Sequence, residues 1–410
     1  MEAISKRDCT ILRDMAKIQI DIAYSQKMEE IKSAWETHGA FKPSSRPMIL
    51  INTSSFENDI IPPLMRCQSE EARKIEWALH RNVVNHTLFS DDTVVDDTMS
   101  ISSYWYFTLF GLDVQFDRSN GLAYHFIPYI NDLGEDFHKF GKSRFGHKTD
   151  IKHDIDIRNE IFGDILPVVE GPFTPSAYAT LELLHLINME DMYTAMLDYP
   201  ELFHKMMEML TVDFLEYFDM LERENALLPT VRSCPLPQGT YCYTDVLLEC
   251  GINLKTKDVW GYMDSQETTG ISPAMFYEFI APYYNRIISR FGLLSYGCCE
   301  AVHNIWDGFL AKLDNLKKVS ISPWCDEDYM GEQLCDRNIV YLRKTSPNYL
   351  GVGVNLDESA LRVHVNKTIV AAKGCFLELI QNDVHQINGT WEKVRRFVDI
   401  LRECSENHVK

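Results

Sequence analysis

From Pro47 onward, short continuous apolar runs alternate with longer stretches of helical periodicity. Runs of this length predict strands that are buried on both faces, as in parallel sheets covered by helices. The predicted strands lie in MILINTS (48–54), DILPVVEGPF (164–173), DVWGYMDSQE (258–267), LLSYGCCE (293–300), KVSISPWC (318–325), NIVYLRKT (338–345) and CFLELIQND (375–383). We therefore expect an α/β fold.

Helical periodicity is clearest in two segments. Residues 390–403 begin with Thr390, a residue type favoured at helix N-caps. Residues 201–222 carry apolar side chains on one helical face, at Leu202, Met206, Leu210, Phe214, Phe218 and Leu221. The regular alternation of strand and helix in the last third predicts a (β/α)8 TIM barrel. An open doubly wound sheet is the alternative, but no GxGxxG motif follows an early strand.

The first part of the chain has a different pattern. Between residues 5 and 37, apolar side chains recur at helical spacing with charges between them, at Ile11, Leu12, Met15, Ile18, Ile22 and Met28. This predicts one or two amphipathic helices. We interpret residues 1–45 as an N-terminal helical extension and residues 46–410 as the barrel. The extension would pack across the barrel or against a second subunit, so a homodimer is one possible assembly.

The charge balance narrows the range of partners. The chain has 410 residues, with 40 Lys and Arg against 60 Asp and Glu, for a net charge of −20. Such a field repels phosphate backbones and anionic membrane surfaces, which argues against nucleic acid and membranes as partners. No apolar run reaches the length of a membrane helix, and the N-terminus is too charged for a signal peptide. We expect a cytoplasmic protein.

Polar and thiol side chains follow the C-terminal ends of the predicted strands, where the loops of a barrel meet at one mouth. They are Asp264, Gln266 and Glu267; Cys298, Cys299 and Glu300; Trp324, Cys325 and Asp326; Lys344; and Asn382, Asp383 and His385. Zinc binds thiolate, imidazole and carboxylate groups. We predict a zinc site with Cys298 or its neighbour Cys299 as a ligand, completed from Cys325, Asp383 and His385. The alternative is that these thiols only pack against the barrel core.

Three stretches resemble the uroporphyrinogen decarboxylase superfamily. They are VVEGPFTPSAYATLELL (168–184), SQETTGISPAMFYEFIAPYYNRI (265–287) and LLSYGCCEAVHNIWDGFLAKLDNLKKVSISPWCD (293–326). The motifs YGCCE and SISPWCD are similar to the branch that transfers methyl groups to corrinoid proteins. The resemblance spans residues 46–403. It differs from true decarboxylases in having no arginine between Pro47 and Met65, and Tyr296 stands where thiol-methylating members carry a histidine.

The resemblance implies the first methyltransferase of a corrinoid-dependent O-demethylase, with a methoxylated aromatic donor and a corrinoid protein as partner. The leaving oxygen would be stabilised by zinc or by a proton from Glu300, Lys344, Asp383 or His385. Donor-binding candidates are Tyr262, Asp264, Gln266, Tyr296 and Trp324. A second zinc triad, Asp307, Cys335 and Cys375, has a spacing associated with ether-cleaving methyltransferases, although the predicted elements place it near the opposite face. Two other functions stay open: tetrapyrrole decarboxylation, and a non-catalytic barrel that binds a corrinoid protein or a small molecule.

Overall fold

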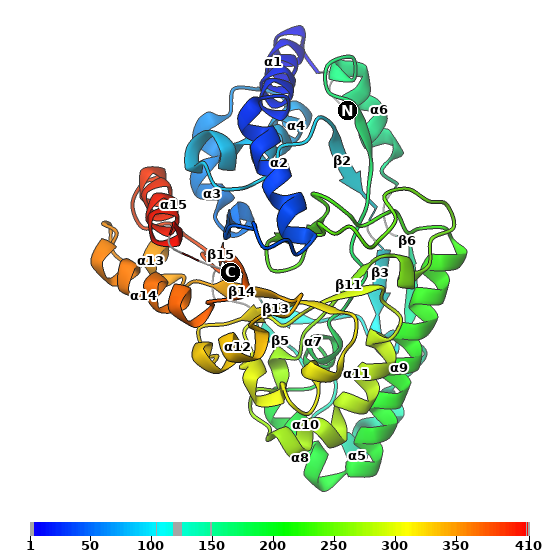
Figure 1. Ribbon diagram of the computed structural model, residues 1–410. Helices are drawn as coiled ribbons and strands as arrows, with labels where there is room; N and C mark the ends of the chain where they lie inside the picture. The colour runs from blue at the N-terminus through cyan, green and yellow to red at the C-terminus, as the bar shows by residue number, and fades with distance from the viewer. Residues whose placement is uncertain (1–3, 104, 118–124, 148–149, 407, 409–410) are drawn as a thin grey trace.

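The computed structural model describes residues 4–103, 105–117, 125–147, 150–406 and 408. Its main sheet has seven strands, all parallel to their neighbours (Figure 1). In spatial order these are β1 (Met48–Ile51), β15 (Phe376–Gln381), β14 (Val340–Lys344), β13 (Leu316–Ile321), β12 (Leu293–Tyr296), β11 (Trp260–Met263) and β8 (Ser176–Ala177). Six of them are the strands that the continuous apolar runs predict; β8 is not among the predicted strands.

The sheet is not hydrogen-bonded into a closed ring within the described residues, so the α/β fold with a parallel sheet is confirmed and the complete (β/α)8 barrel stays a prediction. Its edges are β1 and β8. Strand β8 has only two residues because Pro172 and Pro175 lie just before it, and proline has no N–H for a ladder. The predicted strand at 164–173 contains β7 (Val168–Gly171), which pairs instead with β2 (Met99–Ser102) in a separate parallel pair.

A short hairpin lies between the two edges of the main sheet. Its strands are β9 (Pro235–Leu236) and β10 (Thr240–Tyr241). At the β8 edge, the Thr174 hydroxyl donates to the Pro235 carbonyl oxygen. At the β1 edge, a Cβ built on Gly239 would lie 3.2 Å from the Asn52 Cβ atom, so the turn packs closely there. The hairpin tip is thereby held beside the C-terminal ends of the strands.

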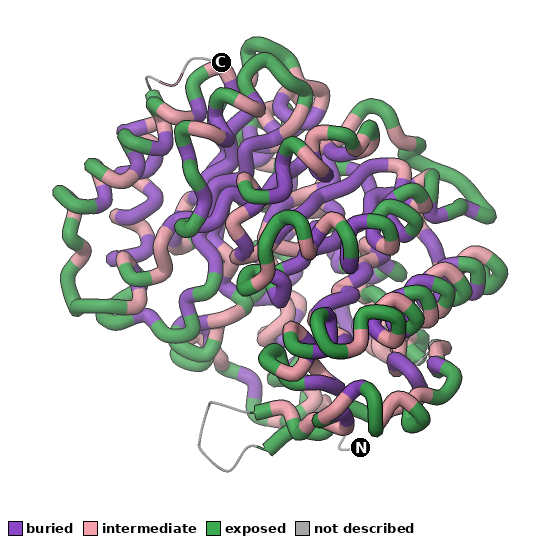
Figure 2. The backbone as a smooth tube through the Cα atoms, turned by 90° about the horizontal axis from the view of Figure 1, so that it is seen from below, coloured by how far each residue is buried: buried purple, intermediate pink, exposed green. Residues whose placement is uncertain are grey.

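Helices cover the outside of the sheet, and Figure 2 shows the strands buried while the outer helix surfaces are exposed. The two clearest predicted helices are α9 (Pro200–Arg223) and α15 (Trp391–Ser405). Apart from the helices at the N-terminal end of the chain, which are described below, the others are α3 (Glu57–Ile60), α5 (Leu133–Asp136), α6 (Lys152–Phe162), α7 (Ala179–Leu184), α8 (Met189–Asp198), α10 (Pro273–Phe279), α11 (Ala281–Ile288), α12 (Glu327–Leu334), α13 (Asn348–Gly351) and α14 (Glu358–Ala371). No helix in the described part of the chain is both long and apolar enough to cross a membrane.

The N-terminal segment forms α1 (Lys6–Ala23) and α2 (Gln26–Gly39), which lie with α4 (Glu70–Val84) at one end of the molecule (Figure 1). Helix α2 closes the N-terminal end of the sheet. His38 packs edge-on against Phe376, the first residue of β15, and its Nε2 atom lies 3.4 Å from the Glu378 carboxylate. That carboxylate also pairs with Lys318 at 2.6 Å. The open end of the strands is therefore the C-terminal one.

A segment between β2 and α6 adds two antiparallel pairs that the apolar pattern does not predict. They are β3 (Trp105–Thr108) with β6 (Arg144–His147), and β4 (Phe116–Asp117) with β5 (His125–Phe126). Phe107 of β3 stacks on Phe214 of α9, with ring centroids 4.6 Å apart. This insertion thus packs on the long helix.

Candidate functional site

Four side chains from three strand ends form a cluster at the C-terminal end of the sheet. Cys298 and Cys299 follow β12, Lys344 is the last residue of β14, and Asp383 follows β15. The two Sγ atoms are 3.7 Å apart. Lys344 Nζ lies 3.4 Å from the Cys299 Sγ atom, 3.9 Å from that of Cys298 and 3.0 Å from the Asp383 carboxylate. We call these four residues the thiol–lysine cluster.

Two unusual backbone conformations present this cluster. Gly297 has a φ of +100°, and a Cβ atom there would come within 3.2 Å of the Val302 side chain. Only glycine adopts this conformation without strain, and it turns the chain after β12 so that both thiols reach the mouth. Asp383 has a φ of +61°, a left-handed conformation that aspartate tolerates better than most residues. Strained residues of this kind concentrate at functional sites.

A chain of hydrogen bonds leads from Lys344 across the mouth to a buried carboxyl group. Lys344 Nζ donates to the Gln238 side-chain oxygen at 2.9 Å, and the Gln238 amide donates to the Tyr262 hydroxyl at 2.9 Å. That hydroxyl lies 3.0 Å from Oδ2 of Asp264 and 3.1 Å from the Gly297 carbonyl oxygen, to either of which it can donate. Gln238 sits at the tip of the β9–β10 hairpin, so the hairpin completes the site.

Asp264 is a buried acid with one free oxygen. It follows β11 directly, is 5% exposed, and its Oδ1 atom has no hydrogen-bond partner among the described residues. Burial, followed by the nearby Glu300 and Glu267 carboxylates, raises the pKa of Asp264 to about 8. At neutral pH the group therefore carries a proton.

The two thiols are not equivalent. Cys298 donates a hydrogen bond to Cys299, and that bond together with the Lys344 ammonium group lowers the pKa of the Cys299 thiol to about 7, against the effect of burial. The same hydrogen bond and burial raise the pKa of Cys298. Burial disfavours the charge on Lys344, but the two thiols and Asp383 outweigh burial and raise its pKa. Of the two thiols, Cys299 is therefore the one that more readily carries negative charge, although the Asp383 carboxylate opposes it.

Glu300 holds two strand-end loops together. Its carboxylate accepts the backbone N–H of Cys298 at 2.7 Å and that of Ser265 at 2.9 Å. Glu300 is buried, and burial raises its pKa in spite of these bonds. The catalytic role predicted from the sequence therefore competes with a structural one, because Glu300 fixes the turn that carries the thiols.

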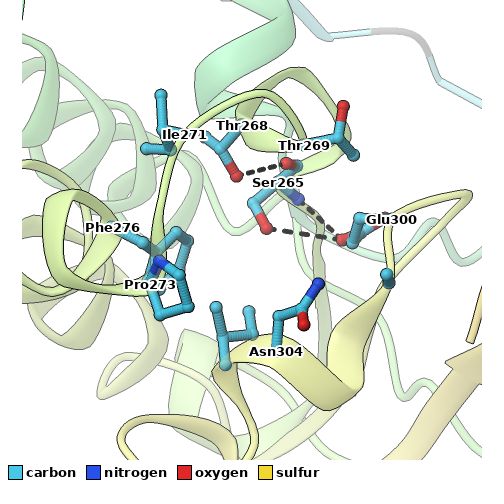
Figure 3. Close-up of a pocket in the computed structure, with 10 residues that line it drawn as sticks. Ser265, Thr268, Thr269, Ile271, Pro273, Phe276, Glu300 and Asn304 are labelled. Carbon is cyan, nitrogen blue, oxygen red and sulfur yellow. Dashed lines mark hydrogen bonds between the residues drawn. The ribbon is translucent and has the colours of Figure 1, made fainter. Parts of the chain in front are cut away.

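A small pocket with a free volume of about 50 Å³, partly open to solvent, lies beside Ser265 and Glu300. Figure 3 shows Pro273 and Phe276 on one side of this pocket, with Ser265 and Glu300 facing them. The rest of its lining is mixed, with Thr268, Thr269 and Asn304 as polar members and Ile271, Ala301 and Ile305 as apolar members. Because Ser265 follows Asp264 in the chain, the pocket adjoins the strand end that carries the buried acid.

The predicted zinc ligands are only partly brought together. Cys298, Cys299 and Asp383 meet in the thiol–lysine cluster, but Cys325 is buried and bonds to the Ser322 hydroxyl and the Glu300 carbonyl oxygen. His385 is exposed on the loop after β15.

The second triad is not assembled as a set of three: Cys335 and Cys375 both reach the Gly331 carbonyl oxygen, but Asp307 lies apart from them. Asp307 accepts from Tyr329 near the start of α12, whereas Cys335 follows the end of that helix, about 9 Å further along its axis. Cys375 precedes β15 and contacts the Gly331 carbonyl oxygen.

The donors at the mouth do not fit a zinc ion. An ammonium group, Lys344, occupies the space between the thiols and the carboxylate, and a divalent cation there would be repelled by it. No group of three or more His, Cys, Asp or Glu side chains within the described ranges is arranged to hold a metal ion. The positive charge of this site is therefore supplied by Lys344.

The predicted donor-binding residues fall into two groups. Tyr262, Asp264 and Tyr296 are buried, and the Tyr296 hydroxyl donates to Ser265. Gln266 is exposed, and Trp324 is 75% exposed on the loop after β13. The buried tyrosines thus position polar groups at the strand ends, while Trp324 faces solvent.

Two residues of the site were not predicted from the sequence. Gln238 bridges Lys344 and Tyr262, and the Tyr178 ring packs against that of Tyr262 with centroids 5.3 Å apart. Burial, followed by Asp264, raises the pKa of Tyr178 to about 12. Gln238 and Gly239 both have positive φ, which is typical of a tight hairpin turn. The segment PQG could have indicated the turn, but not its position in the mouth.

Comparison with known proteins gives a likeness of fold. No family model matches the sequence, and no curated protein matches it. Among solved structures, a methyltransferase from Methanosarcina mazei is similar with a TM-score of 0.51 and 12% sequence identity, over 91% of this chain and 98% of that chain. This likeness extends over nearly the whole of both chains and supports the α/β architecture of a parallel sheet covered by helices.

Proposed function

We propose that the chain is a methyltransferase that moves a methyl group from a methoxylated aromatic compound to the cobalt of a corrinoid carried by a separate protein. One observation carries this proposal: a buried carboxyl group, whose pKa is raised to about 8, and a buried ammonium group share the C-terminal mouth of the sheet. The likeness of fold to a methyltransferase and the motifs YGCCE and SISPWCD support it.

The chemistry needs an acid because the oxygen of an aryl methyl ether is a poor leaving group. The bond between the methyl carbon and oxygen breaks, the methyl carbon goes to cobalt, and the oxygen receives a proton. Asp264 is suited to give that proton, since it is neutral at pH 7 and its Oδ1 atom has no other partner among the described residues. A positioned general acid contributes about 10²–10⁴ in rate. Solvent then returns a proton to Asp264.

Lys344 supplies the positive charge that a metal would otherwise provide. It is 3% exposed, so its field acts through a medium of low dielectric constant and is worth more than in water. The bridge through Gln238 and Tyr262 fixes it relative to Asp264. Together the two groups stabilise charge as it develops on the leaving oxygen.

The pocket beside Ser265 has a lining that suits an aromatic donor, but its free volume of about 50 Å³ would have to widen to admit a ring. Phe276, Ile271 and Ile305 give it apolar walls. Ser265 and Asn304 offer hydrogen bonds to ring substituents. The exposed mouth would remain free for the partner protein that carries the corrinoid.

The test uses the purified chain, a corrinoid protein reduced to cobalt(I) and a panel of methoxyarenes, with formation of methylcobalt followed by absorption. We expect methylation with at least one donor, and a loss of about 10²–10⁴ in rate for Asp264→Asn. Asp245→Asn, which removes an exposed carboxylate, serves as the matched control and should keep the full rate. Consumption of uroporphyrinogen without methylation by any donor would contradict the proposal.

A further inference from the structure

The two adjacent thiols have chemistry that the proposed methyl transfer does not use. Cys298 and Cys299 are half-buried, whereas Cys325 and Cys375 are buried. The Sγ atoms of the pair are 3.7 Å apart and face Lys344. We propose that this pair is an oxidation site at which a hydroperoxide attacks Cys299 and Cys298 then closes a disulfide between adjacent residues.

The geometry assigns different roles to the two sulfurs. Lys344 Nζ is closer to the Cys299 Sγ atom, at 3.4 Å, than to that of Cys298, at 3.9 Å. Cys298 donates its S–H toward Cys299, so the second thiol also stabilises negative charge on Cys299. The Asp383 carboxylate lies 3.9 Å from the Cys299 Sγ atom and opposes that charge, but it is farther from the sulfur than Lys344 Nζ. The thiolate is the reactive form of cysteine, and cationic neighbours favour it. Cys299 is therefore the nucleophile and Cys298 the resolving thiol.

The reaction balances with a hydroperoxide as the only oxidant. The Cys299 sulfur attacks one peroxide oxygen, the O–O bond breaks, and the leaving hydroxide or alkoxide takes a proton from solvent. Cys299 is oxidised by two electrons to a sulfenic acid. The Cys298 sulfur then attacks the Cys299 sulfur, an S–S bond forms and the S–OH bond breaks. The released hydroxide leaves as water with the proton of Cys298.

The disulfide would be strained, and it would therefore be reversible. Adjacent Cα atoms are 3.8 Å apart across a trans peptide bond, shorter than the usual 4.4–6.8 Å of a disulfide. Strained disulfides are more easily reduced and are the labile, regulatory ones. Closure would also remove the thiolate that faces Lys344, and would so change the electrostatics of the mouth.

The experiment treats the intact wild-type chain with a few equivalents of hydrogen peroxide and maps its tryptic peptides by mass. Cleavage after Arg290 and Lys312 gives a peptide, residues 291–312, whose only cysteines are Cys298 and Cys299. We expect this peptide to lose two hydrogens, and a thiol reductant to restore them. The reaction should precede oxidation of Cys335, an exposed thiol whose Sγ atom lies 3.6 Å from the Asp336 carboxylate.

Variants separate the two steps. Cys298→Ser should stop at the sulfenic acid, which dimedone traps on Cys299, and Cys299→Ser should abolish both products. Lys344→Met should slow the first step about tenfold for each unit by which it raises the pKa of Cys299. Equal oxidation rates at Cys335 and Cys299 would overturn the proposal. Addition of oxygen atoms to the two thiols without formation of an S–S bond would also overturn it. A third contradicting result would be a zinc ion, bound in a one-to-one ratio, that prevents oxidation of the two thiols until a chelator removes the zinc. The site depends on the thiols and Lys344 alone, whatever donor the chain uses.

Discussion

Replacing Asp264 by asparagine should stabilise the protein at neutral pH and should do so in a pH-dependent way. The buried carboxyl group has its pKa raised from 3.8 to about 8. In the unfolded chain the group ionises above about pH 4, whereas in the folded chain it keeps its proton until about pH 8. The folded state binds more protons in this window, so stability falls as pH rises through it.

The magnitude follows from the same shift. Each pKa unit corresponds to about 1.4 kcal/mol, so at pH 7 the wild-type chain loses about 4 kcal/mol of unfolding free energy to keep Asp264 protonated. Asparagine avoids this loss and still accepts the Tyr262 hydrogen bond. Its amide N–H₂, in the place of the free Oδ1 atom, would be an unsatisfied buried donor that costs about 1–3 kcal/mol. The net expected gain at pH 7 is about 1–3 kcal/mol.

Denaturant unfolding of both proteins between pH 5 and pH 8 provides the assay. The advantage of Asp264→Asn over wild type should grow by about 1.4 kcal/mol per pH unit and level off near pH 8. Asp245→Asn, at an exposed position, corrects for the general effect of removing one negative charge from a chain of net charge −20. An advantage that does not change with pH would refute the reasoning, because it would mean that Asp264 is ionised in the folded state.

Three further predictions concern the cation at the mouth, the N-terminal end of the sheet and the turn after β12. Lys344→Met should slow methyl transfer about 10²-fold with an unactivated methoxyarene, and less with donors whose phenols are more acidic, as rate constants across a donor series would show. Lys318→Met should lower the unfolding free energy by about 3–5 kcal/mol in denaturant titrations, because it leaves the buried Glu378 carboxylate without its closest cation. Lys318 and His38 hold the Glu378 pKa at about 2 against burial, and the stability that this provides should persist above about pH 4.5 and be lost as pH falls toward 2. Gly297→Ala should cost about 1–3 kcal/mol and reduce the reactivity of Cys299 toward iodoacetamide, since alanine strains the positive φ that presents the thiols.

The strands of the sheet could be predicted because their pattern is local. The runs LLSY and VYLRK begin with apolar residues and are buried along their whole length, which only a strand covered on both faces allows. Catalytic residues of barrels lie at the C-terminal ends of the strands, and this rule predicts that Cys298, Lys344 and Asp383 lie at the same end of the sheet.

The remaining features depend on contacts between distant segments. The β9–β10 hairpin is too short to show periodicity, yet it delivers Gln238 to Lys344, which is 106 residues away in the chain. The raised pKa of Asp264 depends on burial and on nearby carboxylates, and the sequence shows neither of these. The conformation of the loop after β15 is also not visible in the sequence. Asp383 adopts a left-handed backbone conformation there and its carboxylate contacts Lys344, whereas His385 is exposed.

The most direct test of methyl transfer at this mouth is a single-turnover reaction with a methoxyarene whose methyl carbon is labelled with carbon-13. The purified chain and a cobalt(I) corrinoid protein would be mixed with this donor, and the labelled carbon followed by NMR. We predict that the label appears on cobalt as the free phenol is released in equal amount, and that Asp264→Asn slows both together. Phenol release without labelled methylcobalt, or an Asp264→Asn variant as fast as wild type, would contradict the account.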